Sequence, residues 1–219
     1  MSNKSVAKQR SNKSAKLFVF AAPSGAGKTT LVHAVVTKHP ELRFSISYTT
    51  REPRINEAKG VDYIFINEVE FMQLRDQGEM LEYAQVFDNY YATSRSQVDK
   101  HLSEDRSVVL EIDWQGARQV RESMPNCVTI FILPPSLEEL ERRLRDRRTD
   151  KPEVIERRLR DARSDMAHWE EFDHVIINDN LNEAILALED VLEGRGETSS
   201  TANPDLKAAV QRIIGQPPL

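Results

Sequence analysis

The chain lacks the features that disulfide-stabilised and membrane-embedded proteins need. Cys127 is the only cysteine among 219 residues, so no disulfide can form within the chain, and we expect a reducing, cytoplasmic setting. No stretch approaches the roughly 20 apolar residues that a membrane-spanning helix requires. A chain of this length can bury a sufficient core without a metal, and it fits one domain with small appendages.

A net positive charge is also missing, because the chain has 30 Lys and Arg but 35 Asp and Glu. This balance does not favour a nucleic-acid partner. Residues 1–16 carry five Lys or Arg and no acid, and they lack Leu, Ile and Phe. We interpret them as a disordered basic tail, too polar for a signal peptide. The five histidines have no metal-site spacing. We expect neither a nucleic-acid nor a membrane partner, and a homo-oligomer is compatible with these features.

Short apolar runs alternate with helical patterns along most of the chain. Residues 17–21, 108–112, 128–133 and 175–177 are continuous apolar runs of the kind found in buried parallel strands. Their alternation with helices predicts an α/β fold with a central parallel sheet. No internal repeat is present.

Residues 45–100 differ from this pattern. They contain short alternating runs and all five tyrosines, which predicts a small β-rich excursion from the sheet. The aromatic residues can either pack this subdomain or line a ligand pocket together with Arg51 and Arg54.

From residue 136 the chain becomes helical and basic. Ser136 and Glu139 form a potential capping box, and a second helix restarts near Pro152. Nine arginines fall between positions 142 and 163; they either cover solvated helix faces or bind phosphate. Residues 194–205 have the composition of a linker, and a weak terminal helix follows.

The stretch APSGAGKTT at residues 22–30 matches the phosphate-binding pattern G-x-x-x-x-G-K-[ST], except that Ala22 replaces the first glycine. It follows an apolar strand and opens a helix, which is the context the motif requires. Backbone N–H groups there would surround phosphate oxygens, with Lys28 on the outer phosphates and Thr29 on Mg²⁺. At negative φ an alanine is sterically allowed, and even favoured by up to about 1 kcal/mol. The alternative, a purely structural turn, leaves the coincidence of Gly27, Lys28 and Thr29 unexplained. The predicted nucleotide-binding residues are Ala22, Pro23, Ser24, Gly25, Ala26, Gly27, Lys28, Thr29 and Thr30.

Two acids follow the apolar run at 108–112. Glu111 and Asp113 lie two residues apart, so in a strand they share a face. We predict that Thr29, Glu111 and Asp113 hold Mg²⁺, partly through water. The alternative is a strand-end acid that only caps the following turn.

Eight blocks then resemble the guanylate kinases: APSGAGKTT, SYTTREPR, GVDYIF, LEYAQVFDNYYATS, LEIDWQGA, FILPPS, ERRLRDRRTD and VIIND. The resemblance covers residues 17 to about 192, nearly everything outside the two tails. The resemblance implies a P-loop three-layer α/β fold with a central parallel sheet, a small β-rich GMP-binding subdomain and a helical lid. It also implies ATP-dependent phosphorylation of GMP to GDP, with Mg²⁺ as cofactor and ATP as co-substrate. The implied boundaries are a tail at 1–16, a kinase-like domain at 17–193, and a linker with a C-terminal helix at 194–219. Within the kinase-like domain, the core is formed by 17–44, 101–140 and 156–193, the GMP-binding subdomain by 45–100, and the lid by 141–155.

The resemblance also assigns roles to individual residues. The GMP-binding set is Ser47, Arg51, Arg54, Tyr63, Glu82, Tyr91, Thr93 and Asp113. Glu82 suits guanine because one carboxylate can accept from the two adjacent N–H donors of that base. Adenine would leave the carboxylate mispaired, which can discriminate by about 10⁴-fold. The implied catalytic residues are Lys28, Arg51, Arg143, Arg147 and Arg158, and Asn178 is implied on the adenine side of ATP.

Three positions depart from the family pattern. Glu111 stands where Asp is frequent, Asp146 and Arg148 stand where many relatives have glycine, and Ala92 replaces a common glycine. None of them removes a charge that phosphoryl transfer requires. Two other functions stay open: a catalytically inactive guanylate kinase-like module that binds proteins, and a kinase for another acceptor, such as a sugar phosphate.

Overall fold

The computed structural model describes residues 14–86, 88–146 and 152–215. Its centre is a five-stranded sheet in the order β2-β7-β1-β8-β9, and every pair of neighbours is parallel. The strands are β1 (Leu17–Ala21), β2 (Arg43–Phe44), β7 (Val108–Glu111), β8 (Val128–Leu133) and β9 (His174–Ile177). The four apolar runs thus form strands as predicted, and the two-residue β2 is an addition at the edge.

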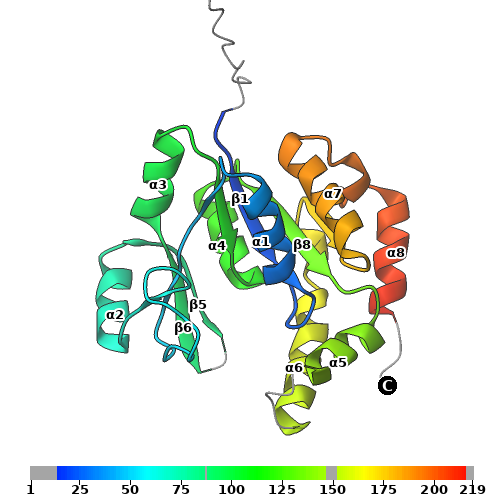
Figure 1. Cartoon of the computed structure of the whole chain (residues 1–219), viewed down its shortest axis with the longest axis horizontal. Coiled ribbons are helices and arrows are strands. Elements are labelled where there is room, and N and C mark those ends of the chain that lie inside the picture. Colours follow the sequence, from blue (N-terminus) through cyan, green and yellow to red (C-terminus); the bar gives the residue numbers. More distant parts are fainter. Residues whose placement is uncertain (1–13, 87, 147–151, 216–219) are drawn as a thin grey trace, which may run out of the picture.

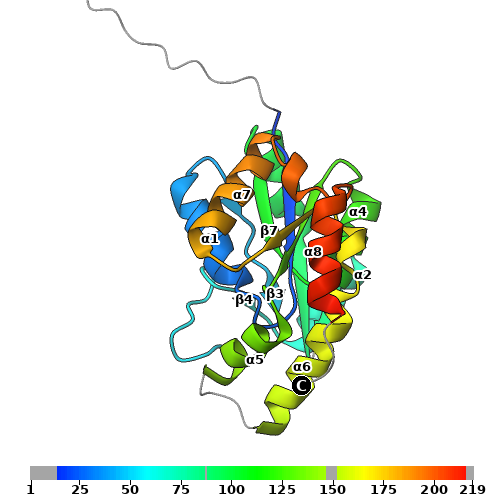
Figure 2. The same ribbon diagram turned by 90° about the vertical axis from the view of Figure 1, so that its right-hand side faces the viewer.

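Helices cover both faces of this sheet, as Figure 2 shows. One layer contains α1 (Lys28–Lys38) and α7 (Leu181–Glu193); the other contains α3 (Arg95–Ser103), α4 (Trp114–Ser123), α5 (Leu137–Asp146), α6 (Pro152–Met166) and α8 (Pro204–Ile214). Alternate residues of β1 divide between the layers: Phe18 and Phe20 pack with α1 and α7, whereas Leu17 and Val19 pack with the other layer. The predicted three-layer α/β fold is confirmed.

A smaller, mixed sheet lies beside the main one (Figure 1, cyan and green). Its order is β4-β3-β6-β5, with β3 (Tyr48–Thr49), β4 (Ile64–Phe65), β5 (Met80–Val86) and β6 (Asn89–Ser94). Phe71 of α2 (Glu68–Asp76) packs on this sheet with Met80 and Ala92. The helix begins at a capping box in which Asn67 and Glu70 satisfy each other's backbone N–H groups.

The C-terminal segment packs more closely than its composition indicates. After the short helix η1 (Trp169–Glu171) and β9, residues 194–203 include η2 (Glu197–Ser199) and a bridge between His174 and Ser200. Asn203 caps α8, and Val210 on that helix is fully buried. Within the described residues, no helix is long and apolar enough to cross a bilayer.

Candidate active site

A cavity of about 340 Å³ lies where the phosphate loop, the smaller sheet and the loop after β7 converge. The cavity lies at the carboxyl ends of the parallel strands, which is where α/β folds bind their ligands. The predicted site residues that line the cavity are Ala22, Pro23, Ser24, Gly25, Gly27, Lys28, Thr29, Thr30, Ser47, Tyr63, Glu82, Tyr91, Glu111 and Asp113. Segments that are far apart in the sequence, from Ala22 to Asp165, therefore share one pocket.

The phosphate loop reaches its shape through two glycines. Gly25 and Gly27 have φ of 93° and 89°, a left-handed conformation that strains other residues. Gly27 is also the N-cap of α1, so the helix begins at Lys28. Asp105 is the only non-glycine with positive φ among the described residues. The chain therefore does not need a glycine at Ala22.

Lys28 and Thr29 extend from the start of α1 toward β7. The ammonium of Lys28 donates to the Ile112 carbonyl at 2.9 Å and lies 3.9 Å from Glu111. Burial lowers the pKa of Lys28, and the charges of Glu111 and Asp113 oppose this. The Thr29 hydroxyl donates to the Glu111 carboxylate. The two hard oxygen donors of Thr29 and Glu111 are thus adjacent, which suits Mg²⁺.

Asp113 has a structural role as well as a place in the cavity. Its Oδ1 accepts the Gly116 N–H at 2.8 Å and so caps α4. Both the capping alternative and a position in the pocket are thus realised by this residue. Glu111 alone of the two acids contacts Thr29.

Glu82 is a buried carboxylate on β5, with only 3% of its surface exposed. Thr93, its partner across the β5–β6 pair, donates a hydrogen bond of 2.7 Å to Oε1. Burial raises the pKa of Glu82 to about 7, and the bond from Thr93 partly offsets this. Thr93 does not itself line the cavity; it orients Glu82.

The tyrosines and arginines of the smaller sheet form one cluster. The rings of Tyr63 and Tyr91 lie 6.0 Å apart, and the Arg51 guanidinium lies 5.4 Å above the Tyr63 ring. Glu57 holds Arg51 through two hydrogen bonds of 2.8 and 2.9 Å. The side chain of Arg54 is 70% exposed and 3.9 Å from Glu57. Neither arginine lines the cavity, although Arg51 contacts a residue that does.

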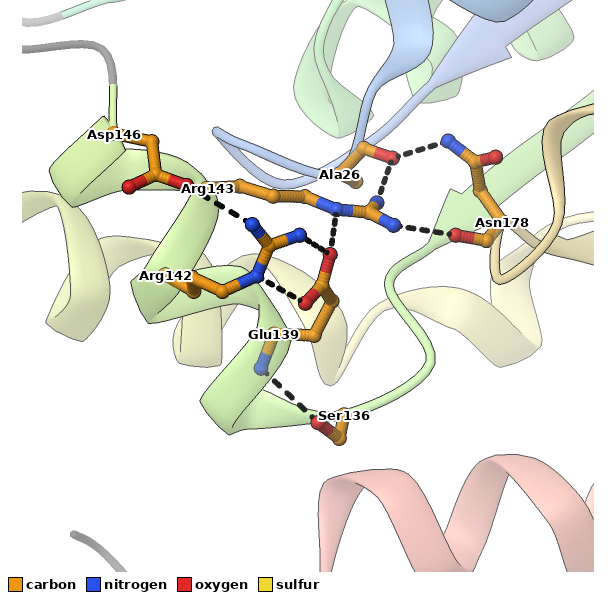
Figure 3. Close-up of polar contacts among 7 residues, drawn as sticks. All are labelled: Ala26, Ser136, Glu139, Arg142, Arg143, Asp146 and Asn178. Carbon is orange, nitrogen blue, oxygen red and sulfur yellow. Dashed lines mark hydrogen bonds and ion pairs between the residues drawn. The ribbon is translucent and has the colours of Figure 1, made fainter.

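The remaining predicted residues lie behind or beside the cavity. Arg143 and Asn178 approach the carbonyl of Ala26 from outside the pocket, at 3.3 and 2.8 Å (Figure 3). Arg158 is half-buried on α6, one turn before Asp161. Arg147, with Arg148, falls outside the described residues.

Five lining residues were not predicted from the sequence: Ala84, Val86, Ile112, Asp161 and Asp165. Ala84 and Val86 follow Glu82 at two-residue intervals on β5, so strand periodicity could have found them. Asp161 and Asp165 lie four residues apart on α6 and share its face. The Trp114 indole donates to Asp165 at 3.0 Å, while burial raises the pKa of that carboxyl to about 6.

The cavity is rich in carboxylates. Among the described residues that line it, Lys28 is the only cation, whereas five are acids: Glu82, Glu111, Asp113, Asp161 and Asp165. No three acidic, His or Cys side chains of the described residues cluster tightly enough to form a metal site by themselves.

Three features together define a P-loop kinase. They are the central parallel sheet, the glycine-rich loop that is followed by Lys28 and Thr29 at the start of α1, and the acid Glu111 on the adjacent strand β7. Comparison with known proteins narrows this class. The guanylate kinase family model matches residues 14–195, and the chain belongs to that family.

Three guanylate kinases match this chain over between 77% and 94% of its length. The guanylate kinase of Alkalilimnicola ehrlichii is 46% identical over 91% of this chain and 98% of its own length. That of Aromatoleum aromaticum is 53% identical over 77% of this chain and 83% of its own. The crystal structure of guanylate kinase from Anaplasma phagocytophilum superposes with a TM-score of 0.69 at 30% identity, covering 94% of this chain and 98% of that one.

Proposed function

We propose that the chain transfers the γ-phosphoryl group of ATP to the phosphate of GMP, which yields ADP and GDP. The observation that carries the proposal is the shared cavity: the phosphate loop and Glu82 line the same pocket of about 340 Å³. With ATP on the loop and the guanine of GMP on Glu82, the γ-phosphate of ATP and the phosphate of GMP would therefore lie next to each other in this cavity.

The chemistry requires alignment and positive charge more than acid–base catalysis. Loop N–H groups and Lys28 would hold the triphosphate, and Lys28 is already desolvated beside Ile112. Thr29 and Glu111, with Asp113 nearby, would hold Mg²⁺ directly or through water. Bound there, Mg²⁺ would neutralise charge on the phosphates. Arg143 on α5 and Arg158 on α6 are proposed to add positive charge, as is Arg147, which falls outside the described residues.

On the acceptor side, Glu82 would accept the two N–H donors of guanine, with Thr93 keeping the carboxylate in place and Ser47 beside it. Tyr63 and Tyr91 would donate to the GMP phosphate. Arg51 and Arg54 are proposed to join them by releasing Glu57, since a phosphate dianion competes well for a guanidinium fork.

The decisive experiment is a coupled assay with ATP and Mg²⁺, in which GMP, AMP, UMP and a sugar phosphate compete as acceptors. We expect GDP formation and strong discrimination against AMP. Absence of GDP would contradict the proposal and leave a protein-binding module, for which none of the comparisons gives support. The cytoplasmic location stays a prediction, tested by fractionation.

A further inference from the structure

Gln119 connects α4 to the edge of the smaller sheet. β5 ends the strand order β4-β3-β6-β5, so among the described strands only β6 pairs with it. On the other side of β5, the Oε1 atom of Gln119 accepts from the Tyr83 N–H at 3.1 Å, and its Nε2 donates to the Tyr83 carbonyl at 2.7 Å. One side chain thus satisfies both backbone groups of a residue that lies 36 positions away in the sequence.

These two bonds copy those of a paired strand. In an antiparallel pair, every second residue exchanges both its N–H and its C=O bonds with the residue opposite. The primary amide of glutamine offers the same kinds of donor and acceptor as a peptide group, and Gln119 directs both at Tyr83. Gln119 therefore extends the sheet by one residue, and it fixes the position of the β5 backbone at Tyr83.

The residue held in this way adjoins Glu82. Side chains alternate along β5: Glu82 and Ala84 line the cavity, whereas the side chain of Tyr83 is exposed. The Tyr83 N–H belongs to the planar peptide unit that begins at the Cα of Glu82, so a bond to it also fixes the point from which the carboxylate extends. Thr93 holds the carboxylate itself. The two ends of the Glu82 side chain are therefore held by different residues.

The helix that carries Gln119 is packed in the main core. Its neighbours Ala117 and Val120 are 3% and 0% exposed and belong to the cluster that also contains Leu110 of β7. Gln119 can therefore move only if that core moves too. β7 also carries Glu111, so the contact between α4 and β5 links the strand of Glu82 to the part of the molecule that is proposed to bind ATP and Mg²⁺.

We propose that Gln119 is a positioning residue for guanine selection: it holds the β5 backbone so that both carboxylate oxygens of Glu82 face the two adjacent donors of the base. The inference rests on the proposed function in that Glu82 accepts from guanine. Alignment and stability can be separated here, because Tyr83 is exposed and water can replace both bonds when Gln119 is substituted. Substitution then costs little stability and leaves Glu82 less well aligned.

The test compares GMP with IMP, whose base lacks the exocyclic amino group and offers Glu82 one donor instead of two. Gln119→Met keeps the length of the side chain and removes both bonds to Tyr83. It should raise KM for GMP about tenfold but KM for IMP by no more than about threefold, because only guanine needs both oxygens in place. KM for ATP should stay unchanged, and the melting temperature should fall by less than about 3 °C.

Gln73→Met is the matched control, since it makes the same chemical change at an exposed position of α2. It should leave KM for both acceptors unchanged. Gln119→Glu is a second variant, which keeps the acceptor for the Tyr83 N–H and loses only the donor to the Tyr83 carbonyl. It should lower the preference for GMP over IMP in the same direction, and it provides the comparison even if Gln119→Met does not fold.

Three results would overturn the proposal. Equal rises of KM for GMP and IMP would show that Gln119 places the whole subdomain and does not align Glu82 with the base. A matching rise of KM for ATP would make the residue generally structural, and unchanged KM values would remove it from acceptor binding. Failure of the wild-type protein to form GDP would instead refute the proposed function, while the affinities for GMP and IMP, measured by calorimetry, would still test Gln119.

Discussion

Gly116 of α4 faces the carboxylate of Glu82 so closely that a Cβ on Gly116 would lie 2.5 Å from Oε2 and 3.1 Å from Cδ. The absence of a side chain at the start of one helix thus leaves room for the buried acid of the neighbouring sheet. The N–H of the same glycine is capped by Asp113. The position of Glu82 therefore depends on a residue with no functional group of its own.

Gly116→Ala should raise KM for GMP about tenfold or more and leave KM for ATP unchanged. The new methyl group must displace the Glu82 carboxylate, while alanine itself is favoured over glycine in a helix by about 1 kcal/mol. Steady-state kinetics with each substrate varied would measure this. In a Glu82→Ala background the same substitution should have no further effect on KM for GMP, since interacting residues are non-additive; an additive result would contradict the coupling.

GMP affinity should rise with pH up to about 7. Burial raises the pKa of Glu82 to about 7, and only the ionised carboxylate can accept both guanine N–H groups. The measurement is kcat/KM for GMP from pH 5.5 to 8.5 at saturating ATP. Glu82→Gln is the control because it keeps the titration of the GMP phosphate, and its profile should lack the step assigned to Glu82.

The same carboxylate should affect stability in the opposite direction. Its pKa is higher in the folded state than the ordinary 4.5, so its favourable contribution is complete below pH 4.5 and is lost as pH rises through about 7. The loss amounts to about 3 kcal/mol. Urea unfolding should show that the free energy of unfolding falls more between pH 5 and pH 8 for wild type than for Glu82→Gln. The same fall in both proteins would contradict the assignment to Glu82.

Lys28→Met should reduce kcat at least about 100-fold, as expected for a preorganised charge contact. GMP affinity should remain. Because burial lowers the pKa of Lys28, an uncharged side chain of similar length should not lower the melting temperature. Lys38→Met, at the other end of α1 and paired with Glu189, serves as the control with normal turnover. Normal turnover in Lys28→Met would remove the loop lysine from the mechanism.

Glu139→Gln should raise KM for ATP several-fold by loosening Arg143. The pKa of Glu139 is lowered to about 2, chiefly by Arg142 and then by Arg143, so the carboxylate is ionised at neutral pH. Glu141 makes an equivalent bond to Arg145 on the same helix, and Glu141→Gln should leave KM for ATP unchanged. Equal effects of the two substitutions would indicate only a loss of helix stability.

Val210→Ala should destabilise the protein by about 2 kcal/mol, which corresponds to roughly 4–8 °C in Tm, because Val210 is fully buried on α8. A weakly attached terminal helix would show no such loss. Gln211→Ala, at the exposed neighbouring position, is the control. Thermal melts and turnover at 25 °C would separate stability from activity.

Local sequence patterns were sufficient to predict the central strands of the main sheet and the helix after the first strand. The strand–glycine–helix context of residues 17–38 depends on neighbouring residues, so β1, the loop and α1 could be read directly from the sequence. The same holds for the runs that became β7, β8 and β9. β2 was missed because two residues carry no periodicity, and α2 was missed because tyrosines and alternating runs dominate its surroundings.

The residues of the site were harder to predict from the sequence, because the site is formed by contacts between distant segments. The family resemblance placed Ser47, Tyr63 and Glu82 together, and no local pattern could. Asp161 and Asp165 were missed because the orientation of α6 depends on how Ile155 and Met166 pack. The inward turn of Asn178 toward Ala26 likewise depends on the position of β9, which adjoins β8 and not β1.

The central position of β1 has a consequence for biosynthesis. Its partners β7 and β8 begin 91 and 111 residues later, so a growing polypeptide emerges from the ribosome with its innermost strand still unpaired. Closing such long chain segments is slow relative to local helix formation. The strand that is translated first is therefore paired on both sides only after Leu133, the last residue of β8, has been added.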